Sequence, residues 1–193
     1  LDKLKVMFAG VANPITVSMG AAEVTGVSCS WGKVKKVGNG KFEIIPRSIS
    51  GKEQVKTLRV NGKDKGMAIS QSFAIRVRDF PAPAARHKDL QVGDYEMSRR
   101  DACAFENGIA TIVATPDENS LAALFKAKFV VTDWKVFVQK KGEARYEADW
   151  RGISADCGKQ SSVGTTVTIV DIKARTPSGK IVELAPITYT ITK

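Results

Sequence analysis

The chain has 193 residues, of which 43% are hydrophobic and 26% charged, the balance of an ordinary globular protein. Its formal net charge of +10 is uneven: residues 1–78 carry 14 Lys and Arg against 5 Asp and Glu, whereas residues 79–193 carry 16 against 15. A single histidine, His87, leaves few groups for acid–base or nucleophilic catalysis. We therefore place binding and mechanical roles above catalysis.

The chain begins directly in strand-like alternation at Leu1–Phe8, without an initiator Met or a signal peptide. We expect it to be a fragment of a longer protein whose targeting information lies upstream. No stretch approaches the roughly 18 apolar residues of a membrane span.

Short strand patterns separated by turn signals fill residues 1–78. Strands are expected at Lys5–Gly10, Ile15–Met19, Val24–Trp31, Lys33–Val37, Lys41–Ile45, Val55–Val60 and Met67–Arg78. Turns are expected at Asn13-Pro14, at Gly38-Asn39-Gly40, and over Val60–Gly66, where Asn61-Gly62 opens the turn. Asn and Gly signal turns because they tolerate positive φ at little cost. This regular spacing predicts a small immunoglobulin-like β-sandwich, without the Cys…Trp…Cys framework of antibody domains.

Pro81 and Pro83 mark the boundary between the two halves of the chain. Two prolines this close together forbid regular sheet pairing and favour an extended, semi-rigid path. We expect residues 79–90 to form a Pro/Ala-rich connector. His87, which stands between Arg86 and Lys88, is then an exposed linker residue.

Residues 79–193 predict a second, β-rich domain with one or two short helices. Strands are expected at Gly108–Thr115, Phe125–Gln139, Ala144–Trp150, Thr165–Ala174 and Ile181–Ile191, turns at Pro116–Ser120, Lys140–Glu143 and Arg175–Lys180, and helical segments at Arg99–Ala104 and Ser154–Gln160. The last two strands are rich in Val, Ile and Thr, which favour a half-buried pleat. The predicted fold class is mainly β, in two tandem domains over residues 1–78 and 79–193.

The carboxylates offer only weak signals for chemistry. The candidates for acid–base pairs are Asp117 with Glu118, Asp149 with Asp156, and Asp133. Asp117 and Glu118 lie in a turn, where Asp is favoured for backbone reasons, and a calcium site at Pro116–Asn119 would lack the EF-hand spacing. Phosphate-binding, dinucleotide and nucleophile-elbow motifs do not occur. We predict no catalytic, cofactor-binding or metal-binding residues, and no enzyme.

The three cysteines are Cys29, Cys103 and Cys157, and they form no CxxC pair. A zinc site is therefore not expected. Cys29 lies in a strand-like run and is interpreted as a small buried hydrophobe. Cys103 and Cys157 could pair in an oxidising compartment, which the sequence alone leaves open.

The basic first half indicates an acidic partner, an anionic membrane surface or nucleic acid, or else a solvated charged face that keeps strand edges apart. Nucleic-acid binding requires exposed aromatic side chains among the basic residues. Phe8, Trp31, Phe42 and Phe73 all lie in strand patterns and are expected in the core. We therefore expect no nucleic-acid partner.

Three segments carry a more specific signal. Residues 6–18 read Val-Met-Phe-Ala-Gly-Val-Ala-Asn-Pro-Ile-Thr-Val-Ser, residues 73–83 end in Asp-Phe-Pro-Ala-Pro, and residues 167–180 lead into the strand at Ile187–Ile191. In this order they resemble the opening string, the interdomain hinge and the closing hairpin of the C-terminal periplasmic region of the GldM/PorM family. Residues 97–164 depart most from that family, so no contact residues are transferred there, and the departures favour the non-gliding PorM branch.

The resemblance implies a part in the type IX secretion system, which exports proteins and in gliding bacteria supports motility. The chain would be the last two domains of a periplasmic homodimer, anchored in the inner membrane by an N-terminal transmembrane helix outside this sequence. That helix would pair with GldL/PorL in the motor, and the distal domains would contact the GldK/PorK and GldN/PorN ring at the outer membrane. The implied role is structural, with no cofactor and no small-molecule substrate.

The alternative is a secreted adhesin or carbohydrate-binding β-sandwich module. Such modules present exposed Trp or Tyr on a sheet face, and Trp134 and Trp150 are the candidates. Binding on a glycan array would favour this alternative.

Overall fold

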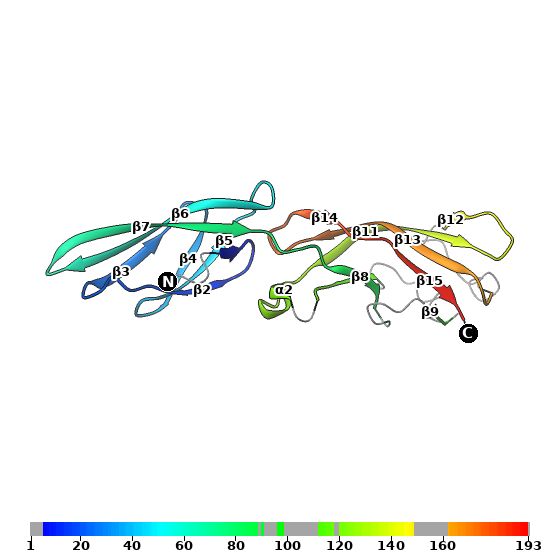
Figure 1. The fold of residues 1–193 in the computed structure, drawn as a ribbon, viewed down its shortest axis with the longest axis horizontal. Helices are drawn as coiled ribbons and strands as arrows, with labels where there is room; N and C mark the ends of the chain where they lie inside the picture. The colour runs from blue at the N-terminus through cyan, green and yellow to red at the C-terminus, as the bar shows by residue number, and fades with distance from the viewer. Residues whose placement is uncertain are drawn as a thin grey trace. The chain divides into compact units, whose positions relative to one another are not determined.

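The computed structural model describes residues 6–88, 90, 96–98, 112–117, 120–148 and 162–192. The chain divides into two compact units. Unit 1 comprises Leu1–Pro81, Leu124–Ala127 and Pro177–Lys180, and unit 2 comprises Ala82–Ala123, Lys128–Thr176 and Ile181–Lys193. Strands make up most of the regular structure in both units (Figure 1), which confirms the predicted mainly-β class.

Unit 1 contains two sheets. The four-stranded sheet has the order β1 (Val6–Phe8), β7 (Met67–Arg78), β6 (Glu53–Asp64) and β3 (Glu23–Ser28). The three-stranded sheet has the order β2 (Asn13–Thr16), β5 (Lys41–Pro46) and β4 (Gly32–Gly38). All neighbours are antiparallel except β1, which runs parallel to β7.

The core of unit 1 is built from both sheets. One cluster of buried side chains joins Met7 on β1, Leu58 on β6 and Ile75 on β7 to Ile44 on β5. A second cluster combines Val17, Phe42 and Val60. Strand alternation explains the pattern, because every second side chain of a strand points to the same face. The two sheets therefore bury their inward faces in shared clusters.

The aromatic residues predicted to lie in this core do so. Phe8 and Phe42 are buried. Trp31 and Phe73 are half-buried and pack against the buried clusters. The side chains that a single-strand nucleic-acid binder would expose are thus occupied by packing.

The turn predicted over Val60–Gly66 is present, but its predicted opening at Asn61-Gly62 is wrong. β6 continues through both residues to Asp64, and the reversal into β7 occurs at Lys65 and Gly66, which have φ angles of 49° and 86°. Gly62 has a packing role instead: a Cβ there would lie 2.7 Å from the Glu23 carbonyl oxygen on β3 and 2.9 Å from Met19 Sδ. The glycine allows two strands to approach closely.

The turn predicted at Asn13-Pro14 is also displaced. These residues open β2, and the turn precedes them at Ala9-Gly10, where Gly10 has φ 81°. Pro14 is tolerated because β2 is an edge strand of its sheet.

Unit 2 is organised around one larger sheet. Its order is β12 (Tyr146–Ala148), β11 (Val130–Gln139), β13 (Thr166–Arg175), β15 (Ile187–Ile191) and β9 (Glu96–Met97), and β14 (Ile181–Glu183) also pairs with β13. β8 (Ala84–His87) and β10 (Ile112–Thr115) form a separate antiparallel pair. One short helix, α2 (Leu121–Leu124), occurs among the described residues. The buried core draws on β11, β13 and β15, with Trp134, Ile172 and Tyr189 among its members.

The strand predicted over Ile181–Ile191 is interrupted. β14 and β15 both pair with β13, but Leu184–Pro186 lies between them. Pro186 has no N–H to donate to a ladder. Opposite the gap, the pairing of β13 with β11 has two register shifts. β11 carries one extra residue between Val131 and Asp133, and β13 carries one extra residue between Lys173 and Val170, where Asp171 adopts φ 53°. A β-bulge therefore bends β13 where its neighbour changes.

Other boundaries in unit 2 are also shifted. β11 begins at Val130 rather than Phe125, because α2 and the residues after it precede the strand. β12 covers three residues of the strand expected at 144–150. The helical segments expected at Arg99–Ala104 and Ser154–Gln160 lie outside the described residues.

The expectation that His87 is an exposed linker residue is wrong. Residues 84–87 form β8, and His87 pairs with Ile112 of β10 and is 0% exposed. Its backbone N–H donates to Tyr189 Oη at 2.8 Å, and the two rings meet edge to face at 6.5 Å between centroids. Pro81 and Pro83 restrict only their own surroundings, so the chain is free to pair from Ala84 onward.

Candidate partner-binding cleft

The carboxylates considered for catalysis occupy ordinary surface positions where they are described. Asp117 is exposed in the turn before α2, where its carbonyl oxygen accepts the Ser120 N–H at 2.9 Å. Asp133 is exposed on β11, with a carboxylate oxygen 3.9 Å from Lys173 Nζ. Glu118, Asp149 and Asp156 lie outside the described residues. Within the described ranges, no three His, Cys, Asp or Glu side chains are grouped to hold a metal ion.

Cys29 is half-buried just after β3 rather than fully buried as expected. Burial raises the pKa of its thiol, although hydrogen bonds from the Trp31 and Gly32 backbone and the positive charge of Arg47 act in the opposite direction. Cys29 is a free cysteine. Cys103 and Cys157 lie outside the described residues.

Trp134 does not form an exposed aromatic platform. It is 3% exposed and belongs to the unit 2 core, so its predicted role in a carbohydrate-binding face is wrong. Trp134 lies two residues before the buried Val136 on β11, and residues at this spacing point to the same face of a strand. The Trp134 side chain therefore faces the core. Trp150 lies outside the described residues.

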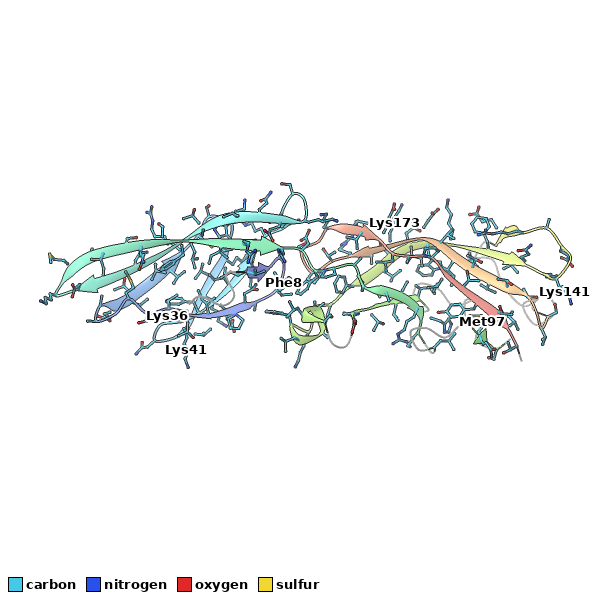
Figure 2. The ribbon with its side chains drawn as sticks, in the orientation of Figure 1. Phe8, Lys36, Lys41, Met97, Lys141 and Lys173 are labelled. Carbon is cyan, nitrogen blue, oxygen red and sulfur yellow. The ribbon has the colours of Figure 1, made fainter. Side chains whose placement is uncertain are left out.

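The edge strands of unit 1 carry features that oppose pairing with another chain. β4 exposes Lys33, Lys35 and Lys36 along one edge of the three-stranded sheet, and Pro14 lies on the opposite edge strand. Figure 2 shows Lys36 and Lys41 at the hairpin that joins β4 to β5. Edge lysines and prolines prevent uncontrolled strand addition. Part of the basic character of unit 1 therefore protects its edges.

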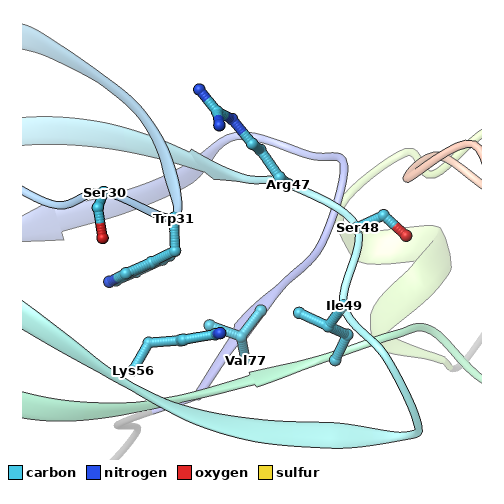
Figure 3. Close-up of a pocket in the computed structure, with 7 residues that line it drawn as sticks. All are labelled: Ser30, Trp31, Arg47, Ser48, Ile49, Lys56 and Val77. Carbon is cyan, nitrogen blue, oxygen red and sulfur yellow. The ribbon is translucent and has the colours of Figure 1, made fainter.

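A cleft of about 290 Å³ lies between the two sheets of unit 1 (Figure 3). Four separate segments line it: Ser30 and Trp31 before β4, Arg47–Ile49 after β5, Lys56 on β6 and Val77 on β7. Val77 and Ile49 are buried and supply an apolar floor. The lining thus combines apolar side chains with two cations.

Hydrogen bonds fix the walls of this cleft. Trp31 Nε1–H donates to the Thr57 carbonyl oxygen at 2.7 Å, which ties the indole ring to β6. The Arg47 backbone N–H donates to the Trp31 carbonyl oxygen at 2.9 Å, which holds the two lining segments together. The aromatic wall is therefore formed before any ligand arrives.

The charge of the cleft is uncompensated. None of its lining residues is acidic. Among the described residues, Arg78 pairs with Glu53 and Lys180 with Asp79, whereas Arg47 and Lys56 form no ion pair. Figure 3 shows the Lys56 side chain extending toward Val77, whereas the exposed Arg47 side chain extends away from the other lining side chains. The arrangement suits a negatively charged group that also has an apolar part.

Sequence reasoning did not find this cleft. Its residues come from distant segments, and no motif links them. One feature of the sequence did point to it. Lys56 lies on the same inward face of β6 as Leu58 and Val60, and an apolar residue is the norm on such a face.

Comparison with known families decides the assignment of unit 1. Residues 1–78 match the family described as the GldM third domain. Residues 1–78 form a GldM-family domain. The expected GldM/PorM resemblance is thereby confirmed, while the PorM branch stays a prediction. A GldM-family domain is typical of a type IX secretion and gliding-motility component.

Other comparisons add little. No curated protein matches the chain. An endo-fucoidan hydrolase from glycoside hydrolase family 107 aligns over 98% of this chain and 32% of its own, at 10% identity and a TM-score of 0.29. The chain thus spans about a third of that hydrolase, and a score this low defines neither a shared fold nor an activity. The described part of the chain contains no helix with the length and hydropathy needed to cross a membrane.

Proposed function

We propose that the chain is a structural and partner-binding module of the periplasmic part of the type IX secretion machinery. The observation that carries the proposal is the match of residues 1–78 to the GldM third domain. In this role the module links the inner-membrane motor to the ring at the outer membrane, and it works by shape and contact rather than by bond-making.

The architecture supports such a role. β6 and β7 pair over twelve residues each, from Glu53↔Arg78 to Asp64↔Met67. Every residue of both strands takes part in this pairing register, which gives unit 1 a stiff central ladder. A load-transmitting module requires elements of this kind.

The placement of His87 supports a non-enzymatic role. The one imidazole of the sequence is fully buried within unit 2, where it contacts Tyr189. A general base must come within hydrogen-bond reach of its substrate. His87 is placed for packing, and we propose that the module has no catalytic activity of its own.

The proposed partners are those that the family resemblance implies. We propose that the intact protein is a periplasmic homodimer anchored in the inner membrane through GldL/PorL, and that the distal domains bind GldK/PorK and GldN/PorN.

A pull-down with the purified chain and the GldK–GldN (or PorK–PorN) complex of the same organism tests this proposal. We expect retention of the complex on the immobilised chain. The matched control is an immobilised unrelated basic protein of equal net charge, which should retain none. Failure of the immobilised chain to retain the complex above this control would contradict the proposed linking role.

A further inference from the structure

We propose that the cleft of unit 1 binds an acidic peptide segment of a partner protein. One carboxylate of the peptide pairs with Lys56, a second pairs outside the cleft with the exposed Arg47, and an apolar side chain of the peptide covers Ile49 and Val77. This inference deepens the proposed function, on which it rests for the assumption that the partner is a protein.

The first argument is the position of Lys56 in β6. The next two inward-facing residues of the strand, Leu58 and Val60, are 3% and 1% exposed, and the cross-strand partner Ile75 is 3% exposed. Lys56 itself is half-buried. A cation on the inward side of a sheet loses hydration, which an opposite charge offsets. The described residues provide no carboxylate partner, so a bound anion would supply it.

The second argument is that the cleft combines apolar and positively charged side chains. A free inorganic anion would leave Ile49, Val77 and the Trp31 ring uncovered, whereas a peptide brings carboxylate and apolar groups together. Rigid aromatic side chains and arginines are enriched among the residues that dominate protein–protein binding energy. The hydrogen bond from Trp31 to Thr57 holds that ring in place. A volume of about 290 Å³ is at the low end for small-molecule sites and accommodates one or two side chains.

The third argument is long-range charge. Residues 1–78 carry an excess of nine positive charges, which attracts acidic partners and accelerates their association at low salt. Nucleic acid would feel the same attraction. However, single-strand binding needs several exposed aromatic platforms. Phe8 and Phe42 are buried and Phe73 packs against the core, which leaves Trp31 as the one aromatic ring of residues 1–78 that lines the cleft. The surface therefore favours an acidic polypeptide.

NMR titration of the full chain tests the proposal. The probe is the peptide acetyl-Asp-Leu-Glu-Asp-Leu-Glu-amide, and the neutral counterpart acetyl-Asn-Leu-Gln-Asn-Leu-Gln-amide is the ligand control. The Trp31 indole N–H and the Arg47 and Ile49 amides report on the cleft directly. Inorganic sulfate and a single-stranded oligonucleotide are titrated in parallel.

Two double variants separate the cleft from general charge. Arg47→Gln/Lys56→Gln and Lys35→Gln/Lys63→Gln each remove two positive charges, but Lys35 and Lys63 are exposed and do not line the cleft. Lys56→Met, which keeps an apolar stem in the same position, provides a second cleft variant. The dispersion of each amide spectrum establishes that the variant is folded.

We expect saturable shifts at the cleft reporters with the acidic peptide, an affinity lowered about tenfold or more by Arg47→Gln/Lys56→Gln, and a change of less than about twofold in the control variant. Equal weakening in both double variants would show nonspecific attraction and overturn the proposal. So would binding of the neutral peptide, sulfate or the oligonucleotide at the same reporters with equal affinity. Absence of shifts at the cleft would overturn it as well.

This titration and the ring pull-down can fail independently. A failed pull-down combined with saturable peptide binding would contradict the assignment of the ring as partner and leave the cleft as an acidic-peptide site. A successful pull-down without cleft shifts would reject the cleft and leave the linking role.

Discussion

The side chain of Asn13 pairs with the backbone of Phe8 through two hydrogen bonds. The Phe8 N–H donates to Asn13 Oδ1 at 2.8 Å, and Asn13 Nδ2 donates to the Phe8 carbonyl oxygen at 2.9 Å. Nδ2 also lies 3.2 Å from the Ile44 carbonyl oxygen on β5. One buried amide therefore joins the end of β1 in the four-stranded sheet to the neighbouring sheet.

Replacing Asn13 should destabilise unit 1 strongly. Asn13→Ala leaves the buried Phe8 N–H and carbonyl without this partner, and Asn13→Asp cannot donate and places a charge in a site that is 4% exposed. We expect losses of about 2–4 kcal/mol in the free energy of unfolding for either variant. Urea unfolding measures this. The exposed turn residue Asn39 is the control, and a wild-type midpoint for Asn13→Asp would contradict the role assigned to the amide.

The contact between His87 and Tyr189 predicts a smaller loss in unit 2. Tyr189→Phe keeps the ring but removes the hydroxyl that accepts the buried His87 N–H. We expect a loss of about 1–3 kcal/mol, the cost of removing one partner of a buried hydrogen bond. Thermal unfolding of this variant is compared with that of Thr188→Val, which alters an exposed hydroxyl on the same strand. Equal stability of the two variants would mean that the hydroxyl contributes nothing.

At Asp171, we expect the stability of the fold to depend on the backbone conformation of the bulge rather than on the charge of the side chain. Asp171 combines φ 53° with an ion pair to Lys135 Nζ at 3.1 Å, and both side chains are more than half exposed. Asp171→Asn should change stability by less than about 1 kcal/mol, because exposed pairs contribute little and Asn tolerates this φ. Asp171→Val should cost about 1–3 kcal/mol, because a β-branched residue is strained there. Unfolding midpoints decide between the two effects; a larger loss for Asn than for Val would assign the importance to the ion pair.

The variant Asp171→Asn should also lower the pKa of Lys135. The hydrogen bond to Asp171 raises the pKa of this ammonium, followed by the charges of Asp171 and Glu147. Asp171→Asn removes the negative charge of this carboxylate and leaves at most a hydrogen bond to a neutral amide oxygen. Measurement of the Lys135 side-chain titration by NMR should therefore show a fall in its pKa, and Lys173, which pairs with Asp133, is the internal comparison.

The Cys29 thiol should react slowly in the folded chain. Burial raises its pKa, so the reactive thiolate is less populated near pH 8 than in an unfolded chain. The stability contribution of the neutral thiol is complete below the unfolded pKa and is lost as the pH rises through the folded pKa. Iodoacetamide labelling, read by peptide mass spectrometry at Cys29 alone, measures the rate.

Arg47 supplies the internal test of this interpretation. Its positive charge lowers the pKa of Cys29, so Arg47→Gln should slow labelling further, whereas the exposed Lys35→Gln should not. Faster labelling in Arg47→Gln would indicate that access, rather than the thiol pKa, controls the rate.

Local sequence was sufficient where a turn is decided by its own residues. Gly38-Asn39-Gly40 predicts the hairpin between β4 and β5, and Met67–Arg78 is predicted with the bounds that β7 has. Both follow from side-chain alternation and from the φ freedom of glycine, which act within a few residues. The structure bears out both predictions.

The candidate cleft could not be predicted in this way. Trp31, Arg47, Lys56 and Val77 are brought together only when β6 and β7 pair and the second sheet packs over them. Strand alternation places Lys56 on the inward face of β6, but the significance of this position depends on which carboxylates lie nearby. That information is absent from any local pattern.

By itself, the sequence determined that the chain is mainly β, where most strands lie, and that His87 is the one imidazole available. The tertiary structure decided that Gly62 spaces two strands, that His87 and Trp134 are buried, and that β13 bends at Asp171. The physical reason is the sequence separation over which each effect acts. Side-chain alternation and turn preference act between residues that are neighbours along the chain. Burial and close approach are set instead by residues such as Glu23 and Tyr189, which are distant in sequence and adjacent in space.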